Sequence, residues 1–528
     1  MDFQASYHSI RQPILARNLV ATSQPLAAQA GLRMLLLGGN AIDAALAAAI
    51  ALTVVEPTSN GIGSDAFAIL WDGEQLHGLN ASGRSPAGWT PERFAKYSTM
   101  PSRGWDTVTV PGAVSAWCAL SKRFGRLKFA QLFEPAISYA RDGYPVSPIT
   151  ATSWARAAAV LKDEPGYAEA FMPGGAAPSI GSTFRCEGMA RTLEEIAETV
   201  GDSFYRGALA NKIVDFSNKC GGVMSLEDLA GHTADWCGTI SIPFYGYEVH
   251  EIPPNGQGIA ALMALGILRE FGGMDSMSPD SAESIHLQIE AMKLAFADLH
   301  RFVSDPATME FDPQTLIETD YLRSRSGFIR PEVAGLPTHG IPKPSGTVYL
   351  TAADSEGRMV SFIQSNYMGF GSGIVVPGTG ISLQNRGCCF RLEQGHPNSV
   401  GPRKRPFQTI IPGFVTQHGS PIMSFGVMGG AMQAQGHVQM AIRVLLHGQS
   451  PQASSDGARW QVMEDGTIAV ESSMAPDVVT QLQSLGHQVS VEGGWGNQAF
   501  GGAQLILKGE DGYIAGSDQR KDGQAVGF

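Results

Sequence analysis

Several signatures of well-known protein classes are missing from this sequence of 528 residues. Its longest apolar stretch, residues 44–55, lies between Asp43 and Glu56 and is shorter than the roughly 20 residues that a membrane-spanning helix needs. Residues 1–20 contain charged side chains and no continuous apolar run, so no secretory signal is expected. We therefore expect a cytoplasmic protein that has no membrane partner.

The motifs of common hydrolases and metal sites are also absent. There is no GxSxG or HExxH motif, and the 12 histidines show no ligand spacing, so serine-hydrolase and zinc-peptidase interpretations have no support. The 6 cysteines contain no CxxC pair, which predicts reduced thiols and no metal site. We interpret the adjacent Cys388 and Cys389 as small buried apolar side chains rather than as a redox-active pair.

Basic residues are too few for a nucleic-acid partner. The 37 Lys and Arg residues against 49 Asp and Glu residues give a net charge of −12, which repels phosphate backbones. The composition, with 43% hydrophobic and 16% charged residues, is typical of a globular protein. A chain of this length can bury a large core, as one large domain or two closely packed parts.

What is present changes in character along the chain. Helical spacing of apolar residues dominates the first 300 residues, and strand-like segments become frequent after residue 346. Residues 310–345 between these regions are broken by proline and glycine and are predicted to form an exposed, flexible loop. The predicted helices are 26–38, 41–55, 112–122, 129–141, 189–200, 258–271, 282–303 and 432–447, and the predicted strands include 66–71, 76–80, 347–353 and 359–364.

The pair Gly346-Thr347 stands where the loop meets the first of the later strands. A threonine released at a chain N-terminus can hydrolyse amides, because its own α-amino group, with a pKa of roughly 8, serves as the base. Cleavage before the threonine is easiest in a loop with glycine at the preceding position, because glycine tolerates strained backbone angles. A Gly-Thr pair that opens a strand is common, so the pair alone does not establish a nucleophile.

A series of ordered motifs surrounds this pair. They are GGNAIDAA at 38–45, VPG at 110–112, PPNGQG at 253–258, the helical run 286–305, GSGIV at 371–375, GI at 380–381, VGPRKRP at 400–406 and GG at 429–430. In content, order and spacing the series resembles the gamma-glutamyltransferase family along nearly the whole chain, and within it the branch that contains cephalosporin acylases.

The resemblance implies an α+β fold of the N-terminal-nucleophile hydrolase type, in which two β-sheets lie between helical layers. It implies a precursor that cleaves itself into residues 1–346 and 347–528, a large and a small subunit that stay together as a heterodimer and can dimerise further. The substrate is a small amide, classically a γ-glutamyl compound such as glutathione, and no cofactor is required.

The resemblance also assigns roles to single residues. Thr347 corresponds to the nucleophile and Gly346 to the residue before the cut. Gly429 and Gly430 correspond to the pair whose amides stabilise the oxyanion. Ser365 corresponds to a second hydroxyl beside the nucleophile, and Arg84 falls near the arginine that binds the substrate carboxylate.

Several positions depart from the family pattern. Cys389 stands where a carboxylate holds the substrate ammonium group, and Arg386 stands where glutamine is usual. Gln408 and Thr409 replace a serine pair, and Tyr367 replaces an asparagine, although Asn366 is adjacent. The segment after Phe390 is short, so the loop that covers the pocket in many members is expected to be truncated.

These departures leave three functions open. The first is hydrolysis or transfer of γ-glutamyl groups. The second keeps the chemistry but accepts glutaryl-type acyl groups that lack the α-amino group, which the uncharged Cys389 favours, because loss of a charged hydrogen-bond partner costs about 1.5–3 kcal/mol. The third is an uncleaved protein that retains the fold for binding.

Overall fold

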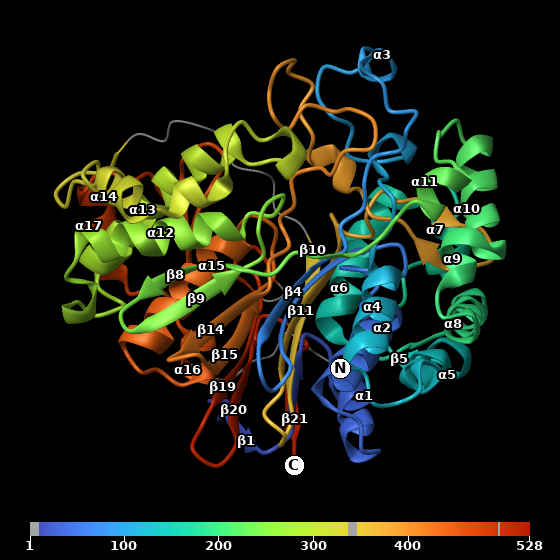
Figure 1. The fold of residues 1–528 in the computed structure, drawn as a ribbon, viewed down its shortest axis with the longest axis horizontal. Coiled ribbons are helices and arrows are strands. Elements are labelled where there is room, and N and C mark those ends of the chain that lie inside the picture. The colour runs from blue at the N-terminus through green and yellow to red at the C-terminus, as the bar shows by residue number, and fades with distance from the viewer. Residues whose placement is uncertain (1–9, 336–345, 495–496) are drawn as a thin grey trace.

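Two stacked β-sheets form the centre of the molecule (Figure 1). The computed structural model describes residues 10–335, 346–494 and 497–528. Both sheets have 7 strands that pair antiparallel, in the orders β1-β20-β19-β15-β14-β9-β8 and β21-β2-β10-β11-β3-β4-β7. The strands of the first sheet are β1 (Ile14–Ala16), β8 (Ile240–Phe244), β9 (Tyr247–Glu251), β14 (Gly413–Gln417), β15 (Ser420–Val427), β19 (Ala503–Lys508) and β20 (Tyr513–Ser517). Those of the second are β2 (Leu19–Thr22), β3 (Asp65–Trp71), β4 (Leu76–Asn80), β7 (Asp235–Trp236), β10 (Gly346–Ala353), β11 (Met359–Tyr367) and β21 (Gln524–Gly527).

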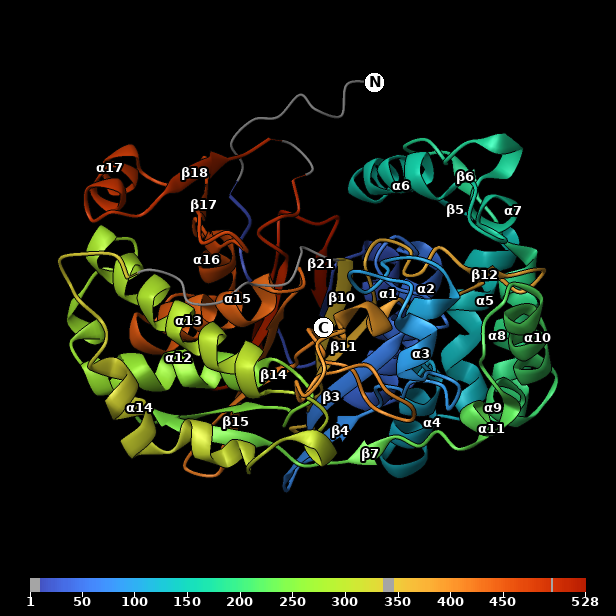
Figure 2. The same ribbon diagram turned by 90° about the horizontal axis from the view of Figure 1, so that it is seen from above.

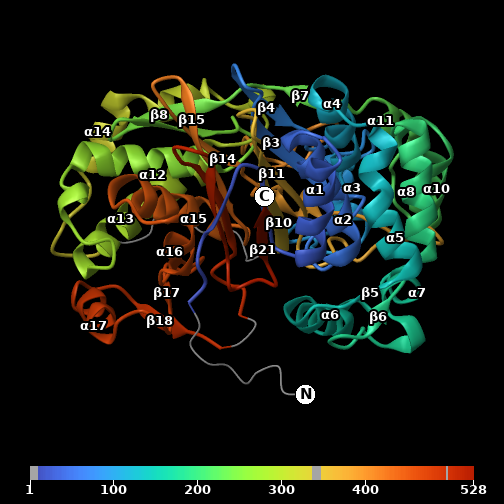
Figure 3. The same ribbon diagram turned by 90° about the horizontal axis from the view of Figure 1, so that it is seen from below.

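Helices cover the outer face of each sheet (Figure 2). On the first sheet lie α12 (Gly258–Phe271) and α15 (Met432–Ala441), with α13 (Ala282–Phe302) packed against both, and on the second lie α1 (Pro25–Leu36) and α2 (Ala41–Val55). Every residue of α2 is buried, because this alanine-rich helix packs on β10 and β11 on one side and on α5 (Glu134–Asp142) on the other (Figure 3). A helix that is apolar all round is stable only when it is enclosed in this way.

The alternation of side chains along β10 decides which residues face the other sheet. Tyr349 belongs to the apolar cluster between the sheets, whereas Val348 and Leu350 belong to the cluster under the helices. Because side chains point alternately to opposite faces, Thr347 and Thr351 share the inter-sheet face with Tyr349. Thr351 confirms this, since its Oγ1 lies 2.5 Å from Ser424 Oγ of the facing sheet.

The predicted fold class and the sandwich of helices, two sheets and helices are confirmed. The predicted helices are present, although the last ends as an α-helix at Ala441 and continues as a π-turn over Ile442–Leu446. The loop predicted over 310–345 is wrong in its first half, because a 3-10 helix (Pro313–Ile317) and α14 (Thr319–Ser326) form there and pack under α12. Residues 336–345 lie outside the described residues. Within the described ranges, no helix is both long and apolar enough to span a membrane.

Candidate active site

Thr347 is the second residue of β10 and lies at an irregularity of the sheet. The pairing of β10 with β11 shifts by one residue between Gly346 and Val348, and such bulges redirect a side chain. Thr347 is 1% exposed, and its Oγ1 lies 3.2 Å from Ser365 Oγ near the end of β11. Ser365 Oγ also accepts the backbone N–H of Tyr367 at 2.7 Å, which fixes its position. The two predicted hydroxyls therefore meet, and their catalytic roles stay predictions.

A third side chain contacts Thr347, and the sequence does not predict it. Gln433, in the first turn of α15, donates from Nε2 to Thr347 Oγ1 at 3.3 Å. Its Oε1 accepts the N–H of Ile411 at 3.0 Å, which fixes the orientation of the amide. The only sequence signal for Gln433 is its position three residues after the glycine pair.

The glycine pair Gly429-Gly430 links β15 to α15. Both residues have positive φ angles, 116° and 63°, and their carbonyls accept from the N–H groups of Met432 and Gln433. Among the described residues, neither glycine donates its own N–H in a hydrogen bond. Two uncommitted amides, one helical turn from the side chain that contacts Thr347, fit the predicted oxyanion site.

Gln257 ties the glycine pair to the predicted substrate residues. Its Nε2 donates to Gly430 O at 2.7 Å and to Thr409 O at 2.6 Å, and the side chain is fully buried. From the sequence, Gln257 was recognised only as part of the PPNGQG motif. Its position explains the glutamine of that motif, because one side-chain amide binds both the glycine pair and the segment that contains Thr409.

Arg386 is a buried cation in this region. Its Nη1 donates to Thr409 Oγ1 at 2.7 Å, and its guanidinium carbon lies 4.3 Å from the centre of the Tyr367 ring. Within the described part of the chain, Nε and Nη2 contact no oxygen acceptor although the side chain is 0% exposed. The charge of Arg386 and a hydrogen bond from it lower the pKa of the neighbouring Cys389 thiol. Tyr367 pairs with Gly346 across the two strands, so Arg386 lies beside the predicted cleavage position. Buried N–H groups without an oxygen acceptor favour an anionic ligand.

Asn366 does not replace the asparagine that the family has at the position of Tyr367. Its Oδ1 accepts from Ser64 Oγ at 2.9 Å, and its Nδ2 donates to Ser382 Oγ at 3.0 Å. Because neighbours on a strand point to opposite faces, Asn366 is turned away from the face that Ser365 occupies.

Asp65 is a second residue that was not predicted from the sequence. This fully buried carboxylate begins β3, pairs in register with Ser365, and accepts from Gln408 Nε2 at 2.6 Å. Burial raises the pKa of Asp65 to about 7, although the charge of Arg386 and the hydrogen bonds of Gly83 and Gln408 lower it. The predicted Gln408 thus orients an acidic group rather than standing alone.

An open cavity of about 630 Å³ lies next to this cluster. Tyr367, Cys388, Cys389 and Phe390 contribute to its wall, together with apolar residues such as Phe407. The expectation that both cysteines are buried is wrong, since each is only partly buried and lines this cavity. All 6 cysteines are free thiols, as predicted.

Arg84 lies apart from these contacts. Its Nη1 donates to Asp305 Oδ2 at 3.1 Å, its side chain is 46% exposed, and it lines a separate cavity of about 130 Å³. Within the ranges that the structure describes, the Arg84 side chain has no hydrogen bond to another predicted site residue. Its role in substrate binding stays a prediction.

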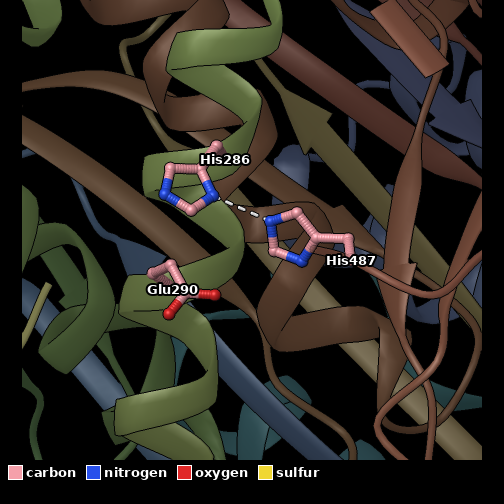
Figure 4. A group of neighbouring side chains, drawn as sticks. All are labelled: His286, Glu290 and His487. Atoms are coloured by element: carbon pink, nitrogen blue, oxygen red, sulfur yellow. Dashed lines mark hydrogen bonds between the residues drawn. The ribbon is translucent and has the colours of Figure 1, made fainter. Parts of the chain in front are cut away.

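A buried cluster anchors the chain shortly before the predicted cut (Figure 4). His286 Nδ1 lies 2.8 Å from His487 Nε2, and His286 Nε2 bonds the carbonyl of Arg330 at 2.8 Å. Glu290 accepts the N–H of Gly335 at 2.8 Å and pairs with Lys293 at 2.8 Å. Because Lys293 already balances the carboxylate and both His286 nitrogens are engaged, we interpret this cluster as an anchor for residues 330–335.

Comparison with known proteins agrees with this geometry. The family model for gamma-glutamyltranspeptidase matches residues 27–528. The chain is 35% identical to a glutathione hydrolase-like YwrD proenzyme of Bacillus subtilis (97% of this chain, 98% of the relative) and 34% identical to an oxamate amidohydrolase proenzyme of Klebsiella pneumoniae (95% and 97%). The crystal structure of cephalosporin acylase from Bacillus halodurans superposes with a TM-score of 0.95 at 47% identity, over 100% of this chain and 99% of the other. The chain therefore belongs to the gamma-glutamyltranspeptidase family of N-terminal-nucleophile hydrolases, whose members are processed into two subunits.

Proposed function

We propose that the protein is a self-processed threonine amidohydrolase that acts on amides whose acyl group ends in a carboxylate, with glutaryl-type amides preferred. The observation that carries the substrate class is the buried Arg386, whose Nε and Nη2 contact no oxygen acceptor among the described residues and which lies beside the strand of Thr347. The similarity to a cephalosporin acylase and to an oxamate amidohydrolase supports the same class.

The first step in this proposal is cleavage between Gly346 and Thr347. Thr347 Oγ1 attacks the carbonyl carbon of Gly346, the resulting ester is hydrolysed, and the α-amino group of Thr347 becomes free. Ser365 and Gln433, which contact Oγ1, hold the hydroxyl in place for this attack.

The same atoms then act on substrate. The free α-amino group takes the proton of Oγ1, Oγ1 attacks the substrate amide, and the N–H groups of Gly429 and Gly430 stabilise the oxyanion. The amine leaves, and water or an acceptor amine releases the acyl group from Thr347. The distal carboxylate of the acyl group binds Arg386.

Hydrolysis or transfer of γ-glutamyl groups is the second candidate. The similarity to a glutathione hydrolase-like protein favours it, and Arg386 can also bind an α-carboxylate. Asp65 is the carboxylate near Arg386, but it is fully buried and already accepts two hydrogen bonds. It is therefore a poor partner for a substrate ammonium group.

The test compares glutaryl, γ-glutamyl and uncharged butyryl 4-nitroanilides. We expect the highest kcat/KM for the glutaryl compound. Arg386→Gln should lower that value about 10- to 100-fold, the range for losing a charged hydrogen bond, and should affect butyryl turnover far less. Arg386→Lys, which keeps the charge, should lose less. A γ-glutamyl preference that survives in Arg386→Gln would contradict the proposal.

A further inference from the structure

The adjacent thiols of Cys388 and Cys389 are accessible from the cavity beside the active site. They end the 3-10 turn Arg386–Cys389, which begins with the buried cation of the site. Both side chains are partly exposed, and both line the cavity of about 630 Å³. Two thiols on consecutive residues, open to small molecules, are not explained by the hydrolytic chemistry.

The surroundings of the two thiols differ. Burial raises the pKa of Cys389, but a hydrogen bond with Cys388, the charge of Arg386 and hydrogen bonds with Tyr367 and Arg386 outweigh burial and lower the pKa to about 7. The pKa of Cys388 is raised well above its usual value by its hydrogen bond with Cys389 and by burial. Cys389 is therefore the thiolate of the pair and Cys388 is the thiol that donates to it.

The other cysteines lack such surroundings. Burial raises the pKa of Cys118 to about 12 and that of Cys237 to about 11, and it also raises the pKa of Cys186. Cys220 is exposed and serves as the surface reference for labelling. In the described part of the chain, neither Cys118 nor Cys237 has both an arginine and a second cysteine beside it, as Cys389 has.

We propose that Cys389 is a modification site within the acyl pocket, where a hydroperoxide oxidises its thiolate and Cys388 resolves the product to a disulfide. In the first step the sulfur attacks the peroxide oxygen, the O–O bond breaks, and Cys389 becomes a sulfenic acid while hydroxide or alkoxide leaves. In the second step the Cys388 sulfur displaces the sulfenic hydroxyl, and water leaves with the Cys388 proton. Overall, two thiols and one hydroperoxide give one disulfide, one water and one water or alcohol.

The disulfide between Cys388 and Cys389 would close a strained ring and should be reduced easily. Neighbouring Cα atoms are about 3.8 Å apart, which is shorter than the usual spacing of about 4.4–6.8 Å across a disulfide. Strained disulfides are reduced more readily by small thiols. Oxidation also removes a negative charge next to Arg386 and alters the wall of the cavity, so it should change acyl-donor binding. This last consequence rests on the proposed function, whereas the modification itself does not.

The first experiment measures alkylation of the purified full-length or processed protein by iodoacetamide, with peptide mass spectrometry at pH values from 6 to 9. We expect the alkylation rate of Cys389 to rise with pH through a midpoint near pH 7, because only the thiolate reacts. Slower labelling of Cys389 than of Cys220 over the whole pH range would overturn the proposal. Cys389→Ser is the matched control and should lose only this label.

The second experiment adds hydrogen peroxide. Wild type should lose two hydrogens from the peptide that contains both cysteines and regain them with dithiothreitol. Cys388→Ser should stop at a sulfenic acid on Cys389 that dimedone traps. If peroxide oxidises Cys220 while Cys388 and Cys389 stay reduced, the proposal is wrong.

Alkylation in the presence of glutarate distinguishes failure of this proposal from failure of the proposed function. Glutarate should slow alkylation of Cys389 if carboxylate-bearing acyl groups occupy the site beside Arg386. If Cys389 reacts but glutarate does not slow the reaction, and the glutaryl anilide is not turned over, the proposed acyl specificity is wrong. The proposed modification site is then still supported.

Discussion

At the scale of single residues, Thr347 is distinguished from the other threonine of the same strand face by its contacts. Thr347 Oγ1 meets Ser365 and Gln433, whereas Thr351 Oγ1 meets Ser424 and links the two sheets. We expect Thr347→Ala to remain one chain of full length and to have no amidase activity, because the variant lacks the attacking oxygen. Thr351→Val is the matched control and should be processed. Intact-mass spectrometry distinguishes the outcomes, and two fragments from Thr347→Ala would show that Thr347 does not cut the chain.

Asp65 predicts a pH dependence of stability. The unfolded chain loses this proton near the ordinary aspartate pKa of 3.8, but the folded protein keeps it until about pH 7. The folded state therefore binds more protons between about pH 4 and pH 7, so stability falls as the pH rises through that window. The shift corresponds to about 4 kcal/mol in total.

Asp65→Asn removes this titration. We expect the unfolding free energy of wild type, relative to Asp65→Asn, to decrease between about pH 4.5 and pH 8. Urea denaturation at several pH values measures the difference. A difference that stays constant, or that grows with pH, would contradict the raised pKa.

At the scale of elements, the turn from β15 into α15 sets the position of the two amides that we assign to the oxyanion site. Gly429 has a φ of 116°, and a Cβ at this residue would lie 3.0 Å from Gly501 Cα. Gly429→Ala should displace the pair and lower kcat about 10²- to 10³-fold, the range for losing one oxyanion donor.

Gly448→Ala is the control for the backbone cost alone, since Gly448 has a φ of 59° and a Cβ added there would have no atom within 4 Å. We expect it to lose a small amount of stability and little activity. Steady-state kinetics on processed protein, with thermal unfolding of both variants, separates the two effects. Equal kcat values for the two variants would argue against an oxyanion role for the pair.

The elements near the nucleophile could be predicted because they depend on local patterns. The strand that begins at Gly346, the hairpin around 354–357 and the enclosed helix α2 all follow from periodicity and turn residues. The resemblance also located Ser365 and the glycine pair. The contacts of Gln433 and Asp65 could not be predicted, because they join segments that are 86 and 343 residues from their partners.

The accessibility of Cys388 and Cys389 could not be predicted either. A pair of cysteines is small and weakly polar and is therefore typical of a core, and only the neighbouring segments around Met100 and Phe407 show that a cavity opens there. The anchor formed by His286, Glu290 and His487 is a similar case, since His487 lies 201 residues beyond His286.

At the scale of the whole molecule, cleavage would not separate the two fragments. In the second sheet, β10 and β11 lie between β2 and β3, and in the first sheet β14, β15, β19 and β20 lie between β1 and β9. Each sheet thus contains strands from both sides of Thr347, and both share the core between the sheets. We expect the cut protein to elute as one species in size-exclusion chromatography and to separate only in denaturant. Elution of free fragments in native buffer would contradict this interleaved arrangement.

The interleaved strands also mean that folding is easy before the cut and difficult after it. Before the cut, β2 and β10 belong to one chain, so their pairing is an intramolecular reaction that does not depend on concentration. After the cut, a molecule that unfolds becomes two chains that must find each other again, and dilution favours their loss to aggregation. The mature protein would then persist because it unfolds slowly rather than because it refolds well, and its working lifetime would be set by an unfolding rate.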